Sequence, residues 1–152
     1  MISNYNTSMR EGNALALISR IRDKANRFIV RELENQGIRG IVPSHGDILV
    51  VLFKENRCTM KGLADRIYRT KSTVTILVEK LIAYGYVKKE KCYQDNRVSY
   101  ISLTDKGMAL KPIFNDISKK LDMLFYGHLT KKEAVAFEKT LSIIKERLDK
   151  EG

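Results

Sequence analysis

The chain has 152 residues, 43% of them hydrophobic, and its 28 Lys and Arg against 18 Asp and Glu give a net charge of +10 at pH 7. This length and composition suit one compact domain with a helical extension and do not favour disorder. No stretch approaches the roughly 20 apolar residues of a membrane span, and the polar start MISNYNTSMREG lacks the apolar segment of a signal peptide. We therefore expect a cytoplasmic protein with no membrane partner.

The first predicted helix covers residues 13–36. Its apolar residues recur every three or four positions, which is typical of an amphipathic helix with one buried face. They are Leu17, Ile18, Ile21, Ala25, Phe28, Ile29 and Leu33. Gly37 and Gly40 are expected to end this helix.

The second predicted helix lies in the stretch VPSHGDILVVLFKEN. We expect Ser44 to be its N-cap and Asp47 to occupy the third helical position, where a carboxylate meets free N–H groups and the positive end of the helix dipole. Residues 48–53 are apolar on all sides. This pattern predicts a helix at the centre of the fold.

Two short helices follow, separated by the tripeptide YRT. Thr59 is the expected cap of the third helix, and Thr70 or Ser72 caps the fourth. The third helix has inward-facing residues at Leu63, Ala64 and Ile67. The fourth has an inward stripe at Val74, Leu77, Val78 and Leu81. Two helices joined by a tight turn indicate a helix-turn-helix.

A strand pair is predicted after the fourth helix. Val87 opens a basic strand, YQDN supplies turn-forming residues, and residues 98–103 alternate between apolar and polar side chains. A two-stranded hairpin is marginal alone, so it must pack on the preceding helices. Helix, turn, helix and hairpin are the order of a winged helix, and the fold class is therefore mainly α with a small β-hairpin wing.

The last third of the chain predicts two helices, at 105–128 and 131–150. Thr104 caps the first, which Pro112 should kink, and Thr130 with Glu133 forms a capping box for the second. Apolar residues of the second helix are spaced 3, 4, 3 and 4 apart, at Ala134, Phe137, Leu141, Ile144 and Leu148. Such spacing forms a seam, and because nothing left in the chain covers it, we infer that a second subunit does.

Two motifs resemble the MarR family of bacterial and archaeal transcription regulators, and the likeness covers nearly the whole chain. Asp95, Arg97, Leu103, Thr104 and Gly107 match the family's wing signature of D-x-R, five residues and L-T-x-x-G. The stretch LADRIYRTKSTVTILVEKLIAYGYVKK is similar to its helix-turn-helix. The resemblance implies a DNA-binding winged helix-turn-helix at 41–104 and a helical dimerisation region at 1–40 and 105–152. It also implies a homodimer that pairs through helices 13–36, 105–128 and 131–150 and binds pseudo-palindromic operators.

The expected DNA contacts fall within or near residues 58–97, where nine Lys or Arg against four Asp or Glu give half of the net charge. The start of the second helix of a helix-turn-helix reads base edges while nearby basic residues hold phosphates. The candidates on this helix are Lys71, Ser72, Thr73, Thr75, Ile76 and Lys80. The alternative is that they are ordinary solvated residues of a surface helix.

The wing adds a second set of contacts. Arg97 beside the turn can enter a narrow minor groove, and Lys88, Lys89 and Lys91 are expected along phosphates. Asp95 would repel DNA if it faced outward, so it either orients Arg97 or pairs with Arg66. A charged edge strand that prevents aggregation is the alternative for the lysines.

Three residues depart from the family pattern. Gly62 replaces a polar helix former and should loosen the first turn of the third helix by about 0.5–1 kcal/mol relative to alanine. Lys89 stands in place of a common arginine, and Asn96 in place of a frequent second arginine at the wing tip. Weaker DNA affinity is expected, with the same fold.

A small-molecule effector is implied by the resemblance, in a pocket between the dimerisation helices and the winged helix. By that analogy His45 lines the pocket, although a histidine at a helix start is often a plain surface residue. Cys58 and Cys92 are expected to be inert thiols, with redox sensing as the alternative. No cofactor or metal site is expected, because neither histidine has a partner at ligand spacing.

The sequence favours a transcription regulator over other classes of protein. It holds no nucleophile elbow, Gly-rich phosphate loop or convergent carboxylate pair, so we expect no enzyme. We predict a homodimeric, sequence-specific regulator of double-stranded DNA, a repressor modulated by a small molecule. The alternatives are a winged-helix module that binds protein and an architectural protein that binds DNA without sequence preference.

Overall fold

The computed structural model describes residues 13–152, and this part of the chain is mainly helical, as predicted. The polar segment at 1–12, with the start of the expected dimerisation region, lies outside the described residues. The chain divides into two compact units, one ending at Ile117 and the other covering Ser118–Gly152. Within residues 13–152, no helix is long and apolar enough to cross a membrane.

Helix α1 (Ala14–Asn35) agrees with the prediction, and the Oδ1 of its N-cap Asn13 accepts a hydrogen bond from the Ala16 N–H. The C-terminal half packs on the core, where Leu33 is buried. Apolar residues of the N-terminal half are 42–76% exposed, namely Leu15, Leu17, Ile18 and Ile21. The apolar face of α1 is therefore covered along only part of its length in the described chain.

Helix α2 (Pro43–Glu55) begins earlier than predicted, and Ser44 is not its N-cap. Val42 takes that position and Pro43 follows, since the fixed φ of proline suits the first helical residue. His45, rather than Asp47, is the third helical residue. The expected central place of α2 is confirmed by three residues that are at most 1% exposed, Ile48, Leu49 and Leu52.

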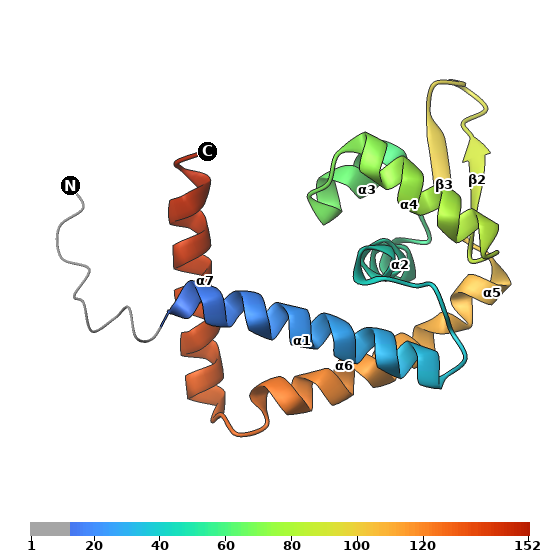
Figure 1. Ribbon diagram of the computed structural model, residues 1–152. Helices are drawn as coiled ribbons and strands as arrows, with labels where there is room; N and C mark the ends of the chain where they lie inside the picture. The colour runs from blue at the N-terminus through green and yellow to red at the C-terminus, as the bar shows by residue number, and fades with distance from the viewer. Residues whose placement is uncertain (1–12) are drawn as a thin grey trace. The chain divides into compact units, whose positions relative to one another are not determined.

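Helices α3 (Met60–Ile67) and α4 (Lys71–Ala83) form the predicted helix-turn-helix, and both pack on α2. Thr59 caps α3, and of the two candidates for α4 it is Thr70 that caps. The fully buried residues of the pair are Leu63, Val74, Val78 and Leu81. Leu77, predicted to face inward, is only partly buried. Figure 1 shows α2, α3 and α4 gathered beside the strands.

The wing has three strands instead of the predicted two. Strands β2 (Val87–Lys91) and β3 (Ser99–Leu103) form the expected hairpin, and β1 (Arg57–Thr59) pairs with the other edge of β3. All pairs are antiparallel. Three residues are too few to show alternation, so β1 could not be predicted from the pattern of apolar and polar residues. This strand ties the base of the wing, which projects beyond the helices in Figure 1, to the helix-turn-helix.

A glycine closes the wing signature for a steric reason. The Thr104 N–H donates to the Tyr86 carbonyl oxygen, which brings the chain after β3 against the end of α4. A Cβ on Gly107 would lie 2.0 Å from that oxygen. Any larger residue at position 107 would therefore push the wing away from the helices.

The helix predicted at 105–128 is two helices, α5 (Asp105–Met108) and α6 (Leu110–Tyr126). The prediction of a kinked single helix was wrong because Pro112 has no N–H for the Met108 carbonyl, four residues earlier, and its ring crowds that oxygen. The break therefore falls at Ala109, ahead of the proline.

Helix α7 (Lys131–Asp149) has the predicted capping box. Thr130 Oγ1 accepts from the Glu133 N–H at 3.2 Å, and Glu133 Oε2 accepts from the Thr130 N–H at 2.8 Å. No residue of α7 is buried in the described chain. Phe137, Ile144 and Leu148 of the predicted seam are 38–66% exposed.

Candidate nucleic-acid interface

Hydroxyl groups order the start of α4. Thr70 Oγ1 accepts from the Thr73 N–H at 3.2 Å and donates to Thr73 Oγ1 at 2.9 Å, while Ser72 Oγ lies 3.1 Å away. Lys71, Ser72 and Thr73 are all exposed. The helix therefore presents a lysine, two hydroxyls and the positive end of its dipole to the same region of solvent.

The remaining candidates on α4 differ in what they can offer. Thr75 is half-buried and its hydroxyl donates to the Lys71 carbonyl oxygen at 2.9 Å, so mainly its methyl group is available. Ile76 is 67% exposed and can touch thymine methyl groups. Lys80 lies nine residues after Lys71, roughly 13 Å along the helix at 1.5 Å per residue, and is thus separate from the reading end.

The wing presents Arg97 with its carboxylate partner beside it. Asp95 Oδ1 accepts from the Arg97 N–H at 3.0 Å and from Nε at 3.1 Å, and Oδ2 lies 3.4 Å from Nη2. These hydrogen bonds lower the pKa of Asp95. The Arg97 side chain is still 90% exposed, so the carboxylate orients the guanidinium without covering it.

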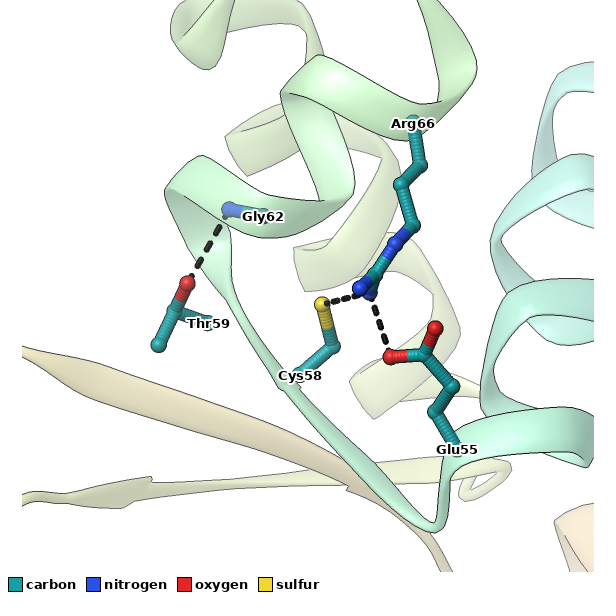
Figure 2. Close-up of polar contacts among 5 residues, drawn as sticks. All are labelled: Glu55, Cys58, Thr59, Gly62 and Arg66. Atoms are coloured by element: carbon teal, nitrogen blue, oxygen red, sulfur yellow. Dashed lines mark hydrogen bonds and ion pairs between the residues drawn. The ribbon is translucent and has the colours of Figure 1, made fainter.

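Arg66 does not pair with Asp95, so this part of the expectation was wrong. Its guanidinium contacts the Glu55 carboxylate and lies 3.1 Å from Cys58 Sγ, as Figure 2 shows. Both partners come from the end of α2 and from β1. Arg66 therefore fastens α3 to the preceding elements and does not act in the wing.

The basic strand does not present its lysines as one row. Lys89 is paired with the buried Ile101, and directly opposed residues share a face of the sheet. Lys89 and Lys91 lie on that face, whereas Lys88 lies on the other and is 3.5 Å from Glu90 Oε1. All three lysines are exposed, and they lie on both faces of the strand.

His45 is buried, 3% exposed, so the surface interpretation was wrong. Its Nδ1 accepts a hydrogen bond from the Val42 N–H at 3.1 Å and so satisfies a donor at the start of α2. Burial, and then the nearby charge of Lys80, lower the pKa of His45 and keep the ring neutral. The effector role of His45 stays a prediction.

Gly62 packs closely against two neighbouring side chains, and the expectation that it loosens the first turn of α3 stays a prediction. A Cβ at this position would lie 2.8 Å from Cys58 Sγ and 3.1 Å from Thr59 Oγ1 (Figure 2). Cys58 is buried, and burial raises the pKa of its thiol. The protonated form is a poor nucleophile, which agrees with an inert thiol. Cys92 is half-buried, and its redox activity stays open.

The sequence interpretation missed one residue of this surface, Tyr68, in the turn between α3 and α4. Its backbone is left-handed, with φ 55° and ψ 46°, and the residue is 84% exposed. The signal was present, because the YRT turn has no glycine where such turns often have one.

Among residues 13–152, no group of three His, Cys, Asp or Glu side chains could hold a metal ion.

Comparison with known sequences finds a matching family model and several relatives for the winged helix. Residues 41–99 match the model of the MarR family. SarZ of Staphylococcus saprophyticus, an HTH-type transcriptional regulator, is 31% identical over 94 residues, which are 62% of this chain and 63% of that protein. SarZ of Staphylococcus haemolyticus is 30% identical over 74 residues, 49% of this chain and 50% of that protein. The chain thus spans about half the length of such curated relatives.

Solved structures confirm the predicted fold over more of the chain. AbsC, a MarR family transcriptional regulator from Streptomyces coelicolor, has a TM-score of 0.82 at 19% identity, with 97% of this chain and 99% of that chain covered. A mutant MarR from E. coli complexed with operator DNA has a TM-score of 0.77 at 20% identity, covering 90% and 96%. At such identities the likeness establishes a shared winged helix-turn-helix fold.

Proposed function

We propose that this chain, which belongs to the MarR family, is a transcription regulator that binds double-stranded DNA with sequence specificity as a homodimer. Residues 41–104 are the DNA-binding part, and 1–40 with 105–152 supply the dimerisation region. The protein acts in the cytoplasm as a repressor, and a small molecule modulates its binding.

One observation carries the proposal: the start of α4 and the tip of the wing are both polar, basic and exposed. Lys71, Ser72 and Thr73 are exposed at the helix start, and Arg97 is held at the wing by Asp95. A recognition helix in a major groove and an arginine in the adjacent minor groove require such a pair of projections. An enzyme or a protein scaffold has no need for both.

Each group has a role in this mechanism. Ser72 and Thr73 exchange hydrogen bonds with base edges, Ile76 contacts thymine methyl groups, and Lys71 meets a guanine or a phosphate. Arg97 enters the minor groove, where the negative potential is strongest. Four further lysines contact phosphates, and these contacts release counterions on binding. They are Lys80, Lys88, Lys89 and Lys91.

Pairing of two chains places two recognition helices on one operator. Exposed apolar residues on α1 and on α7 support the pairing, because monomeric proteins rarely expose large contiguous apolar surfaces. Two-fold symmetry then sets the half-sites about 34 Å apart, one turn of the DNA helix. A protein with this arrangement reads pseudo-palindromes.

Selection of bound duplexes from a random pool, with the full chain as bait, tests the proposal. We expect a two-fold symmetric consensus that binds at least about 10³-fold more tightly than random DNA at physiological salt. Equal affinity for selected and random duplexes would indicate an architectural protein. No binding to any duplex at low salt would favour a protein-binding module instead, with the exposed Ile76 of α4 in its contact surface. Repeating the selection with phenolic ligands tests effector modulation.

A further inference from the structure

Residues 84–86, here named the α4–β2 turn, end the recognition helix and lead into the wing. Gly85, at φ 80°, closes the helix, because its N–H donates to the Ile82 carbonyl oxygen at 2.9 Å. The Tyr86 N–H donates to the Leu81 carbonyl oxygen at 3.0 Å. These bonds satisfy carbonyls of the last helical turn, as is usual at a glycine C-cap.

The next two carbonyl oxygens accept hydrogen bonds from the start of α5. Lys106 Nζ donates to the Tyr84 oxygen at 2.7 Å, and the Thr104 hydroxyl donates to the Gly85 oxygen. The same ammonium lies 4.8 Å from the centre of the Tyr86 ring, within reach of a cation–π interaction. A cation at this end also suits the negative end of the α4 dipole. Lys106 therefore fastens α5 to the end of α4 by both backbone and ring.

A second neighbour of the α4–β2 turn is the loop between α1 and α2. A Cβ on Gly40 would lie 2.9 Å from Cζ of Tyr84, so the tyrosine ring packs directly on the backbone of this loop. Gly37 has nearly the same φ, 78° against 79°. A Cβ on Gly37 would meet nothing within 4 Å among residues 13–152 apart from its chain neighbours. The contact with Tyr84 is thus particular to Gly40.

These contacts join the recognition helix to the proposed dimerisation region. Gly40 and Lys106 belong to its two stretches, 1–40 and 105–152, whereas Tyr84 ends α4. Because α4 has 13 residues and is roughly 20 Å long, a tilt of about 5° at the turn moves the helix start by roughly 2 Å. In a two-fold dimer both helix starts move, so the span between them changes.

We propose that Lys106 is a positioning residue that sets the distance between the two recognition helices of the dimer, and with it the half-site spacing of the operator. Its ammonium holds the Tyr84 carbonyl and the Tyr86 ring and thereby fixes the end of α4 relative to α5. It acts through α4 without contacting DNA. This role rests on the proposed DNA binding and pairing of the chain.

The variant Lys106→Met in the full chain removes the ammonium and keeps a long side chain. Its affinity is measured for the duplex selected by the wild type, for duplexes with one base pair added or removed between the half-sites, and for a single half-site. We expect affinity for the selected duplex to fall roughly tenfold, because a poorer match of span to spacing reduces avidity. Discrimination against the two altered spacings should shrink as well. Half-site affinity, salt slope and thermal midpoint should stay those of the wild type, since a half-site engages one recognition helix.

Lys106→Arg is the conservative variant. A guanidinium also donates to carbonyl oxygens and stacks on aromatic rings, so this variant should keep the affinity and the spacing preference of the wild type.

Gly40→Ala tests the other contact of the α4–β2 turn, with Gly37→Ala as its matched control. Both substitutions place a Cβ at a positive φ, so they share the backbone strain, and only the first crowds Tyr84. We expect Gly40→Ala to weaken spacing discrimination and Gly37→Ala to leave it unchanged. The same discrimination in both variants would remove Gly40 from the device.

Three results for Lys106→Met would overturn its role. Wild-type discrimination among the spacings is one. Equal losses for the selected duplex and the half-site with a lowered midpoint would show that Lys106 only stabilises the fold. A weaker half-site with a salt slope reduced by about one would show a direct phosphate contact. Failure of the proposed function is distinct, since the wild type itself would then bind no duplex at low salt or bind random and selected duplexes equally.

Discussion

Helices α4 and α7 are both amphipathic, yet their apolar residues differ in how far they are buried. In α4, Val74, Val78 and Leu81 are at most 1% exposed. In α7, Ile144 and Leu148 are 46% and 66% exposed, and no residue is buried in the described chain. The stripe of α4 is buried within its own unit, whereas no residue of the α7 stripe is buried among residues 13–152. An apolar pattern therefore indicates a buried face without saying which chain buries it.

The largest effect should come from truncating the stripe of α4. Leu81→Ala is expected to lower the free energy of unfolding by about 2–5 kcal/mol, because it leaves a cavity in a fully packed core. Denaturant titration at fixed chain concentration measures this loss. The same truncation in α7, Leu148→Ala, should change the stability of the fold far less and weaken self-association instead. Equal losses in both variants would remove the distinction between the two helices.

A charge placed in the seam of α7 should separate the subunits. Ile144→Asp is expected to sediment as a monomer at micromolar concentration and to lose roughly 10²-fold or more in operator affinity, since two linked half-sites gain by avidity. Lys139→Gln is the control, because it changes the charge of the same helix by one unit on an exposed polar residue. A dimeric Ile144→Asp protein would show that α7 is not the covering surface.

The unit that contains α4 also has little room for a side chain at Gly62 on α3. Gly62→Ala should destabilise the fold by about 1–3 kcal/mol through overpacking against Cys58, against a gain of under about 1 kcal/mol from helix propensity. Thermal denaturation of the variant decides the sign. In Gly62→Ala/Cys58→Ala the clash with Sγ is gone, so most of the loss should be recovered. A Gly62→Ala protein more stable than the wild type would restore the view that Gly62 merely loosens α3.

On the proposed DNA-binding surface, formed by the start of α4 and the wing, substitution of exposed residues should lower DNA affinity and change the stability of the fold little. Arg97→Ala is expected to lower operator affinity by about tenfold and to reduce the salt slope by about one, with an unchanged thermal midpoint. Arg66→Ala is the contrasting variant, because its guanidinium holds Glu55 and Cys58 and its loss should reduce stability first. Normal operator binding by Arg97→Ala would remove the wing from the mechanism.

The smallest effect concerns pH and the buried His45. Because its pKa is lowered in the fold, the unfolded chain takes up a proton that the native protein does not as pH falls below the usual 6.5. Stability should therefore fall from that pH down to the lowered native pKa, and the contribution is fully present above 6.5. Denaturant titrations between pH 7.5 and 5 should show this slope in the wild type and not in His45→Gln. An identical slope in both proteins would contradict it.

Periodicity in the sequence predicted most of the helices, because burial of one face repeats every three to four residues. The predicted ends of the helices were less accurate, because they depend on single residues such as proline. Pro43 moved the start of α2 ahead of Ser44, and Pro112 split a helix that was expected only to bend. Strand β1 was invisible, since three residues carry no pattern and form a strand only because β3 lies beside them.

The reading surface was predictable in its residue types and less so in its contacts. The start of α4 and the exposed Arg97 with Asp95 follow from the turn and the wing signature. The partners of Arg66 and the crowding at Gly62 depend on where Cys58 lies, which is set by tertiary packing. The strain at Tyr68 could have been suspected from a turn without glycine.

The central claim is that one unit reads DNA while exposed apolar helices join two copies of the chain, and sedimentation velocity tests it most directly. The protein alone and the protein with a selected duplex are compared at micromolar concentration. The account predicts a free species of twice the 17.5 kDa of one chain and a complex of two chains per duplex. A monomer that binds one chain per duplex, or a dimer that binds no duplex at low salt, would contradict it.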